Sequence, residues 1–313
     1  MTTTRLALAG AICRIFPPIV AQPIRNYIFP IKMAREQKRP FSKKTITGSY
    51  FSGNTLDYHG YRVAVHGFFE WRNVIIANFF LKNTTGDIIE IGANIGTETI
   101  SYCDILKKKG NVHAFEPLPQ NLSHLEAIRK NAKNLILYPN AISDREQVVQ
   151  FQVPPSMDSG TGKIITADTA GKDDVLTDVL SAPLDNFLDQ FRDVKFMSID
   201  TEGHEPFVLA GSVKTIATHQ PAIVIEVSPK LLKKYASASN KDIFDFFTHN
   251  GYACYKIDSF SLPEIDAAAL SDTSSHNWLC IPQQSKGVIK ALSRVLFLRA
   301  IVPWYLLKKI PGN

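Results

Sequence analysis

The chain has 313 residues, of which 45% are hydrophobic, and this apolar fraction excludes disorder along its whole length. Its formal net charge is +6 at pH 7, but residues 1–44 carry nine Lys or Arg against one acid, and residues 286–313 carry six against none. The stretch between them has 20 basic and 28 acidic residues. Basic ends on an acidic body suit peripheral contact with an anionic membrane better than a nucleic-acid groove, so we expect no nucleic-acid partner.

The N-terminal extension, expected over residues 1–60, opens with the apolar stretch RLALAGAICRIFPPIV. This stretch is too short to span a bilayer and is interrupted by Arg14 and by two prolines. It is either a cleaved signal segment or an amphipathic helix that ends at Pro17.

The four cysteines of the chain form no CxxC pair, which favours a reducing compartment and therefore a cytoplasmic protein without structural zinc.

Short apolar runs alternate with longer amphipathic ones from Trp71 onward. This alternation predicts strands separated by crossover helices, and so an α/β domain over residues 61–285 with a doubly wound, mainly parallel sheet. The expected strands cover residues 87–92, 111–116, 135–140, 194–200, 222–227, 252–257 and 276–282. The expected helices cover residues 97–110, 119–133, 204–219 and 242–251.

One segment, residues 154–183, interrupts this alternation. It is rich in Ser, Thr, Asp and Gly and is longer than a usual connection between packed elements. It is either a lid or substrate-binding loop, or a disordered insertion.

The last expected element is a basic tail over residues 286–313. Its basic and apolar residues alternate with the spacing of an amphipathic helix. The basic ones are Lys286, Lys290, Arg294 and Arg299, and the apolar ones are Val288, Ile289, Leu292, Val295 and Leu296. The apolar face either completes the core or lies in the headgroup region of an anionic membrane, as the later Trp304, Tyr305, Lys308 and Lys309 would favour. Pro303 argues against a spanning helix.

An apolar strand runs into glycines in the segment DIIEIGANIGTET. A dinucleotide turn requires G-x-G-x-x-G, but the second and third glycine positions after Gly92 are Asn94 and Thr97. No Gly-Lys-Ser/Thr follows, which excludes a P-loop. The segment fits the pattern acid-x-G-x-G-x-G from Glu90 to Gly96, and asparagine tolerates the left-handed backbone that the middle glycine position needs. This pattern predicts a turn at which a strand end approaches S-adenosylmethionine (SAM).

A second acid supports a nucleoside ligand at the same edge of the sheet. Glu116 ends the next predicted strand, in the segment HAFEP. A carboxylate at this place can accept hydrogen bonds from both ribose hydroxyls and would repel a 2′-phosphate. Glu90 and Glu116, with the glycines between them, therefore point to one nucleoside site.

These motifs resemble the FkbM family of SAM-dependent methyltransferases. The resemblance runs from about Gly86 to Val227 and includes EIGANIGTET, VHAFEPLPQN, YPNAISD, PLDNFL and SIDTEGHEPFVLAGS. Its most specific part is an Asp-x-Glu-Gly-x-Glu stretch after the fourth strand, leading into a helix that ends Leu-x-Gly. The matching residues are Asp200, Glu202, Gly203, Glu205, Leu209 and Gly211.

The resemblance implies a class I, Rossmann-like methyltransferase fold with SAM as cofactor. It also implies O-methylation of a hydroxyl on a sugar, glycan or secondary metabolite. By this similarity, Glu90 and the turn from Gly92 through Asn94 to Gly96 would hold the methionine moiety, and Glu116 would hold the ribose. Asn140 and Ala141 would contact the adenine edge, although Asn140 stands where many class I enzymes have an acid.

Three residues are expected at the reacting end of the site. Methyl transfer from a sulfonium is an in-line displacement, so the enzyme must position the acceptor and remove its proton. Asp200, Glu202 and His204 are the candidate catalytic residues, and the histidine titrates near neutral pH. Alternatively, His204 faces solvent at a helix start, and Glu202 interacts with the helix N-terminus.

Other chemistries stay open from the sequence. Asp200 and Glu226 could together hold a divalent metal ion that acidifies the acceptor hydroxyl, so the metal is undecided. A non-catalytic SAM-binding module would lack the acidic stretch after the fourth strand, and a dehydrogenase should have a better glycine fingerprint. The acceptor and the oligomeric state are not predicted.

Overall fold

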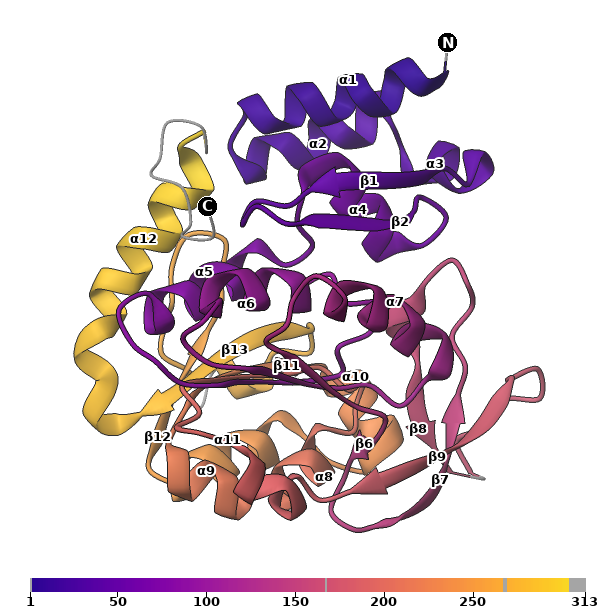
Figure 1. Ribbon diagram of the computed structural model, residues 1–313. Coiled ribbons are helices and arrows are strands. Elements are labelled where there is room, and N and C mark those ends of the chain that lie inside the picture. Colours follow the sequence, from indigo (N-terminus) through magenta and orange to yellow (C-terminus); the bar gives the residue numbers. More distant parts are fainter. Residues whose placement is uncertain (1, 167, 267–268, 304–313) are drawn as a thin grey trace.

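A computed structural model describes residues 2–166, 168–266 and 269–303 of the chain (Figure 1). Its centre is a seven-stranded sheet with the order β12-β13-β11-β10-β3-β4-β5. The strands are β3 (Ile88–Ile91), β4 (Val112–Phe115), β5 (Leu135–Tyr138), β10 (Phe196–Ile199), β11 (Ala222–Val227), β12 (Tyr252–Lys256) and β13 (His276–Pro282). The strands from β11 to β5 run parallel, and β13 is antiparallel to both its neighbours. The prediction of a doubly wound, mainly parallel α/β sheet is confirmed.

Helices cover both faces of this sheet because alternate residues of its strands are apolar on each side (Figure 1). One face, with Ile88 and Val112, packs against α5, α6, α7 and α12, and the other, with Ile89 and Phe115, packs against α8, α9 and α11. These helices are α5 (Trp71–Leu81), α6 (Thr99–Leu106), α7 (Pro119–Arg129), α8 (Glu205–Ala210), α9 (Val213–His219), α11 (Asn240–His249) and α12 (Ile289–Ile301). Short helical turns are α10 (Pro229–Leu231), η1 (Ser159–Thr161), η2 (Leu184–Gln190), η3 (Leu232–Ala236), η4 (Ala269–Ser271) and η5 (Gln283–Val288).

The single helix expected over residues 204–219 is two helices, α8 and α9, separated at Gly211 and Ser212. A Cβ atom at Gly211 would lie 1.9 Å from the carbonyl oxygen of Ser143. The chain therefore passes directly against the backbone of another segment at this point. This close approach explains the glycine and the interruption of the helix.

The N-terminal extension folds as a layer of its own above α5 and α6 (Figure 1). It comprises α1 (Thr2–Ile15), α2 (Pro18–Ile28), α3 (Ile31–Gln37), β1 (Pro40–Lys44), β2 (Tyr50–Asn54) and α4 (Tyr58–His66). A small core joins it, in which Ala9, Cys13 and Ala21 pack against Tyr61 and Val65 of α4. Helix α4 thus crosses the expected domain boundary at residue 60 and links the extension to the main sheet.

The segment over residues 154–183 contains regular structure instead of the long loop that its composition suggested. It contributes to a second sheet with the order β6-β9-β7-β8. The strands are β6 (Ala141–Ile142), β7 (Gln147–Gln152), β8 (Lys163–Ile165) and β9 (Leu176–Ala182). Phe151 and Val179 of this sheet pack against Leu118 and Ala141, which fixes the segment against the end of the main sheet.

Helix α12 completes the main core rather than forming a separate tail. Leu292, Leu296 and Ala300 are buried in the core cluster of α5 and α6, and Val288 and Val295 pack beside them. The apolar face that the sequence offered to a membrane is therefore occupied by the protein itself. The tail residues Trp304, Tyr305, Lys308 and Lys309 lie outside the described residues. Among the residues that are described, none belongs to a helix with the length and apolarity needed to cross a membrane.

Candidate active site

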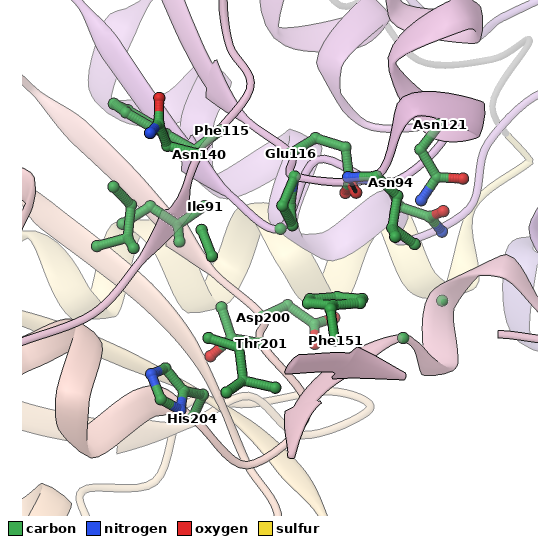
Figure 2. Close-up of a pocket in the computed structure, with 18 of the residues that line it drawn as sticks. Ile91, Asn94, Phe115, Glu116, Asn121, Asn140, Phe151, Asp200, Thr201 and His204 are labelled. Atoms are coloured by element: carbon green, nitrogen blue, oxygen red, sulfur yellow. Dashed lines mark hydrogen bonds between the residues drawn. The ribbon is translucent and has the colours of Figure 1, made fainter. Parts of the chain in front are cut away.

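The strand order reverses between β3 and β10, and a crevice is expected at the carboxyl ends of strands at such a switch point. A cavity of about 530 Å³, including its open mouth, lies there. Its lining includes five of the seven predicted cofactor residues, namely Gly92, Asn94, Glu116, Asn140 and Ala141 (Figure 2). We call it the first cavity.

The turn after β3 has the backbone that its sequence pattern predicts. Gly92 and Gly96 both have φ of 85°, and Asn94 has φ of 50°. A Cβ atom at Gly92 would lie 1.9 Å from the carbonyl oxygen of Asp200, so the turn needs glycine for close approach as well as for its dihedral. Gly96 lies behind the turn, where a Cβ atom would meet the side chains of Leu125 and Ile128 of α7.

Glu116 connects this turn to the end of β4. Its Oε2 accepts a hydrogen bond from Asn94 N at 2.8 Å, and its Oε1 accepts one from Leu118 N at 2.9 Å. Burial raises the pKa of Glu116 to about 7, although these two hydrogen bonds oppose the rise. Each carboxylate oxygen keeps a second lone pair, so the group can still accept from a ligand hydroxyl in the first cavity.

Glu90 belongs to the strand that leads into the turn. It lies within β3, is buried beside Thr99, and does not line the first cavity. Burial, together with the nearby carboxylate of Glu116, raises its pKa to about 8, although the Thr99 hydroxyl opposes the rise. Any effect of Glu90 on a ligand therefore passes through the turn.

The acidic stretch after β10 is a strained turn fastened by Glu205. Glu202 has φ of 56° and Gly203 has φ of 101°. The Oε1 atom of Glu205 accepts hydrogen bonds from Thr201 N at 2.9 Å and from Gly203 N at 3.2 Å. Left-handed backbone at a non-glycine residue is uncommon and is held only where the surroundings fix it. Here it directs Asp200 and Glu202 toward open space while Glu205 stays buried.

A second cavity, of about 1140 Å³ including its open mouth, adjoins the first. The two share Asp200 and Gly160 in their linings. Other lining residues of the second cavity are Tyr58, His59, Phe69, Glu70, Arg72, Asn73, Asp158, Glu202, Glu226, His276 and Asn277. Asp200 therefore stands at the boundary between a cavity formed by the cofactor motifs and one formed by α4, α5, η1 and the end of β11.

Carboxylates gather on the Asp200 side of the second cavity. One oxygen each of Asp200, Glu202 and Glu226 lies within 4.8 Å of the others. Burial raises the pKa of Asp200 well above its ordinary value, and the neighbouring Glu226 and Glu202 add to the rise. Burial likewise raises the pKa of Glu202 to about 7 and of Glu226 to about 8. Glu202 and Glu226 therefore titrate near neutral pH.

His204 lies apart from that cluster. It lines only the first cavity of the two, and Figure 2 shows it beside Thr201, across the cavity from Asn140 and Glu116. Its Nε2 lies 2.9 Å from Ser143 Oγ, which itself donates to Asp144 Oδ1. This chain of donors assigns the imidazole proton to Nε2. Burial lowers the pKa of His204 to about 4, so the ring is neutral at pH 7.

A family model described as "Methyltransferase FkbM domain" matches residues 90–254, a range that holds both the β3 turn and the acidic stretch after β10. The chain belongs to the FkbM methyltransferase family. Its sheet is the class I methyltransferase fold, as the sequence predicted. No curated protein matches the sequence significantly.

Solved structures with similar topology include other methyltransferases. The FkbM methyltransferase of Methylobacillus flagellatus KT is 13% identical over 89% of this chain, with a TM-score of 0.41, and the match spans 58% of that protein. A precorrin-6y C5,15-methyltransferase of Geobacter metallireducens GS-15 is 12% identical over 67% of this chain and 87% of its own, with a TM-score of 0.37. Aeropyrum pernix fibrillarin with bound SAM is 11% identical over 67% of this chain and 76% of its own, with a TM-score of 0.38.

The FkbM motifs gave no indication of the residues that α4 and α5 bring to the second cavity. His59 stacks on Phe69 with ring centroids 3.8 Å apart, and its Nδ1 lies 3.3 Å from Asn94 Nδ2 of the cofactor turn. Asn73 is buried in α5, a helix that is otherwise mostly apolar. A polar residue inside the apolar run WRNVIIANFFL was the one available signal, because all these residues precede the matched family domain.

The N-terminal extension also fastens the segment between the two cavities. Asp57 caps α4 through Gly60 N and accepts a second hydrogen bond from Ser159 N at 2.8 Å. Tyr58 N donates to Met157 O at 3.1 Å. A Cβ atom at Gly160 would lie 2.3 Å from His59 Nε2, so this segment passes directly over the imidazole. The segment over residues 157–160, which covers the site, is therefore held in place by the N-terminal extension.

Proposed function

We propose that this FkbM protein is a SAM-dependent O-methyltransferase that acts on a hydroxyl of an uncharged, polyhydroxylated acceptor such as a sugar or glycan. The observation that carries the proposal is the pair of cavities meeting at Asp200. One cavity is lined by the cofactor motifs, and the other is larger, polar and open. This arrangement suits an enzyme with two substrates better than a module that only binds SAM.

The first cavity offers hydrogen-bond acceptors that suit the hydroxyl and ammonium groups of SAM. Glu116 offers lone pairs for ribose hydroxyls, Asn140 and Ala141 line the opposite side, and the turn at Asn94 exposes backbone close to the strand end. Asn94 Oδ1 is buried without a hydrogen-bond partner, which leaves one acceptor for a ligand ammonium or hydroxyl. When bound, SAM supplies a methyl group on a positively charged sulfonium. A positive charge beside Asp200, at the boundary of the cavities, would favour the ionised form of its carboxyl group.

The second cavity favours a neutral acceptor. Five carboxylates line it, from Glu70, Asp158, Asp200, Glu202 and Glu226, against one arginine, Arg72. Carboxylates accept hydrogen bonds from hydroxyl groups and repel phosphate and carboxylate groups. The rings of Tyr58 and Phe69 add apolar surface on the α4 side. A polyol with an apolar ring face matches this lining.

Glu202 is the proposed base, with Asp200 positioning the hydroxyl. A general base works best when its pKa lies near the operating pH, and burial brings the pKa of Glu202 to about 7. The acceptor proton would pass to a Glu202 oxygen while the acceptor oxygen takes up the methyl group, and the electron pair of the broken carbon–sulfur bond would leave on the sulfur as a neutral thioether. His204 lines only the first cavity, and its Nε2 proton is engaged with Ser143, so we assign it to the cofactor side rather than to the acceptor.

The test is methyl transfer from labelled SAM to a panel of neutral sugars, glycans and glycolipids, with uronic acids and sugar phosphates as anionic counterparts. We expect label on neutral acceptors, and a fall in turnover of about 10²- to 10⁴-fold in Glu202→Gln with SAM affinity unchanged. Full turnover of Glu202→Gln at every pH would exclude it as the base. Methylation of the anionic members alone would contradict the acceptor class.

A metal-assisted mechanism is the second candidate, favoured by the clustering of Asp200, Glu202 and Glu226. Hard divalent ions prefer several carboxylate oxygens, and such an ion would orient and acidify the acceptor hydroxyl. Loss of activity on chelation, restored by Mg²⁺, would support this mechanism. Full activity in the presence of a chelator would leave Glu202 acting alone.

A further inference from the structure

The junction between α1 and α2 lies beside α12 at one corner of the molecule. Ile19 of α2 packs against the same core cluster as Leu292 and Leu296 of α12. In Figure 1 the carboxyl end of α12 lies beside the turn between α1 and α2, and α2 and α12 are in contact. Part of the basic N-terminal segment therefore lies beside the basic helix α12.

Large apolar side chains are exposed around this corner. They are Ile15, Phe16, Val20, Leu298 and Ile301, which are between 40% and 53% exposed. We call these five residues the apolar corner. The helices that carry them already bury their opposite faces, through residues such as Cys13, Ala21 and Leu296. The fold does not need the apolar corner for its own core, so this surface is available to a partner.

Cations flank the apolar corner, and acids are missing from both segments. Lys290 and Arg294 are exposed on α12, and their spacing places them on the same helix face as Leu298 and Ile301. Arg14, at the end of α1, is exposed, although its Nη2 donates to Lys44 O at 2.9 Å. Residues 1–35 and 286–303 contain no Asp or Glu. The charge of this surface thus selects an anionic partner.

We propose that the apolar corner and its flanking cations dock on the surface of an anionic phospholipid membrane. Exposed apolar side chains at a protruding helix junction can enter the headgroup region, and nearby Lys and Arg side chains gain from the negative surface potential. The surface differs from the one that the sequence suggested, because the apolar stripe through Leu292 and Leu296 lies in the core. The inference stands independently of the acceptor and of the catalytic mechanism.

Co-sedimentation with vesicles tests this surface by point substitution. Deletion of residues 286–313 is unsuitable because it would remove Leu292 and Leu296 from the core. The probes are phosphatidylglycerol–phosphatidylcholine vesicles and pure phosphatidylcholine vesicles. We expect binding to the anionic vesicles alone, and roughly 25-fold weaker binding in Lys290→Gln/Arg294→Gln, at about fivefold for each cation. Leu298→Ser/Ile301→Ser should weaken binding by roughly tenfold.

The matched control changes exposed apolar residues elsewhere. Val148 and Leu180, which are 62% and 57% exposed, pair across β7 and β9 in the second sheet, away from α12 and α1 in Figure 1. Val148→Ser/Leu180→Ser should bind vesicles like the wild type. Equal binding by the corner and control variants, all with unchanged melting temperatures, would overturn the proposal. The proposal would also be overturned if the wild type did not bind vesicles but self-associated, and if the corner variants abolished this self-association. The surface would then belong to a contact with a second copy of the chain.

Discussion

Replacing Gly92 by alanine tests the closest backbone contact in the site. The new Cβ atom would lie 1.9 Å from the carbonyl oxygen of Asp200, and the residue has φ of 85°. The left-handed backbone costs an alanine about 1–2 kcal/mol, and forcing the strand ends apart costs about 1–3 kcal/mol more. We therefore expect Gly92→Ala to lower the free energy of unfolding by about 2–5 kcal/mol, measured by urea denaturation, and to abolish SAM binding.

Gly251 provides the control for the dihedral contribution alone. It has φ of 77°, but a Cβ atom there would have no neighbour within 4 Å. Gly251→Ala should therefore lower the free energy of unfolding by only about 1–2 kcal/mol and leave SAM binding intact. Equal destabilisation by the two substitutions, with SAM affinity retained in Gly92→Ala, would refute the argument that β3 and β10 meet at this glycine.

Three further substitutions examine other parts of the site. Asp57→Ala removes the acceptor for Ser159 N as well as the cap of α4, so we expect faster SAM dissociation in stopped-flow measurements. An unchanged rate would show that the N-terminal extension does not hold the segment around Ser159 over the site. His204→Gln should weaken SAM binding several-fold and keep the pH dependence of turnover, and loss of that dependence would instead identify His204 as the base. The folded pKa of Glu226, about 8, exceeds its ordinary 4.5, so the folded protein binds more protons and its stability falls as pH rises toward 8. Glu226→Gln should flatten this fall between pH 6.5 and 8, measured by chemical denaturation. This range lies above the one in which the depressed pKa of His204 makes stability rise with pH. An unchanged slope would contradict the raised pKa of Glu226.

The sequence was most informative where local pattern and tertiary structure agree. Buried parallel strands are short apolar runs, and the seven strands lie within two residues of their predicted bounds at each end. The second sheet was missed because β8 and β9 lie in a polar segment, and their few apolar residues join only a small cluster with Leu118 and Phe151. The break between α8 and α9 depends on contact with Ser143, far away in the sequence, so no local signal marked it.

The lining of the first cavity was predictable because its residues follow directly after strands. Gly92, Asn94 and Glu116 come together by topology alone. The lining of the second cavity was not, because His59 on α4 and Phe69 between α4 and α5 lie outside the family domain. Proximity in sequence was also misleading for His204, which follows Glu202 closely but points to the other side of the strand end, toward Ser143. The apolar stripe of α12 could not be assigned to core or membrane until its packing was known.

Calorimetric titration with SAM, in the wild type and in Glu116→Gln, tests the central claim most directly. The variant keeps the size of the side chain but places an amide where two backbone N–H groups and the ribose hydroxyls need acceptors. We predict one SAM site in the wild type, no binding of NAD, and a dissociation constant about 10- to 150-fold higher in Glu116→Gln, corresponding to a loss of about 1.5–3 kcal/mol. Unchanged SAM affinity in a folded Glu116→Gln variant, or binding of NAD in place of SAM, would contradict the account.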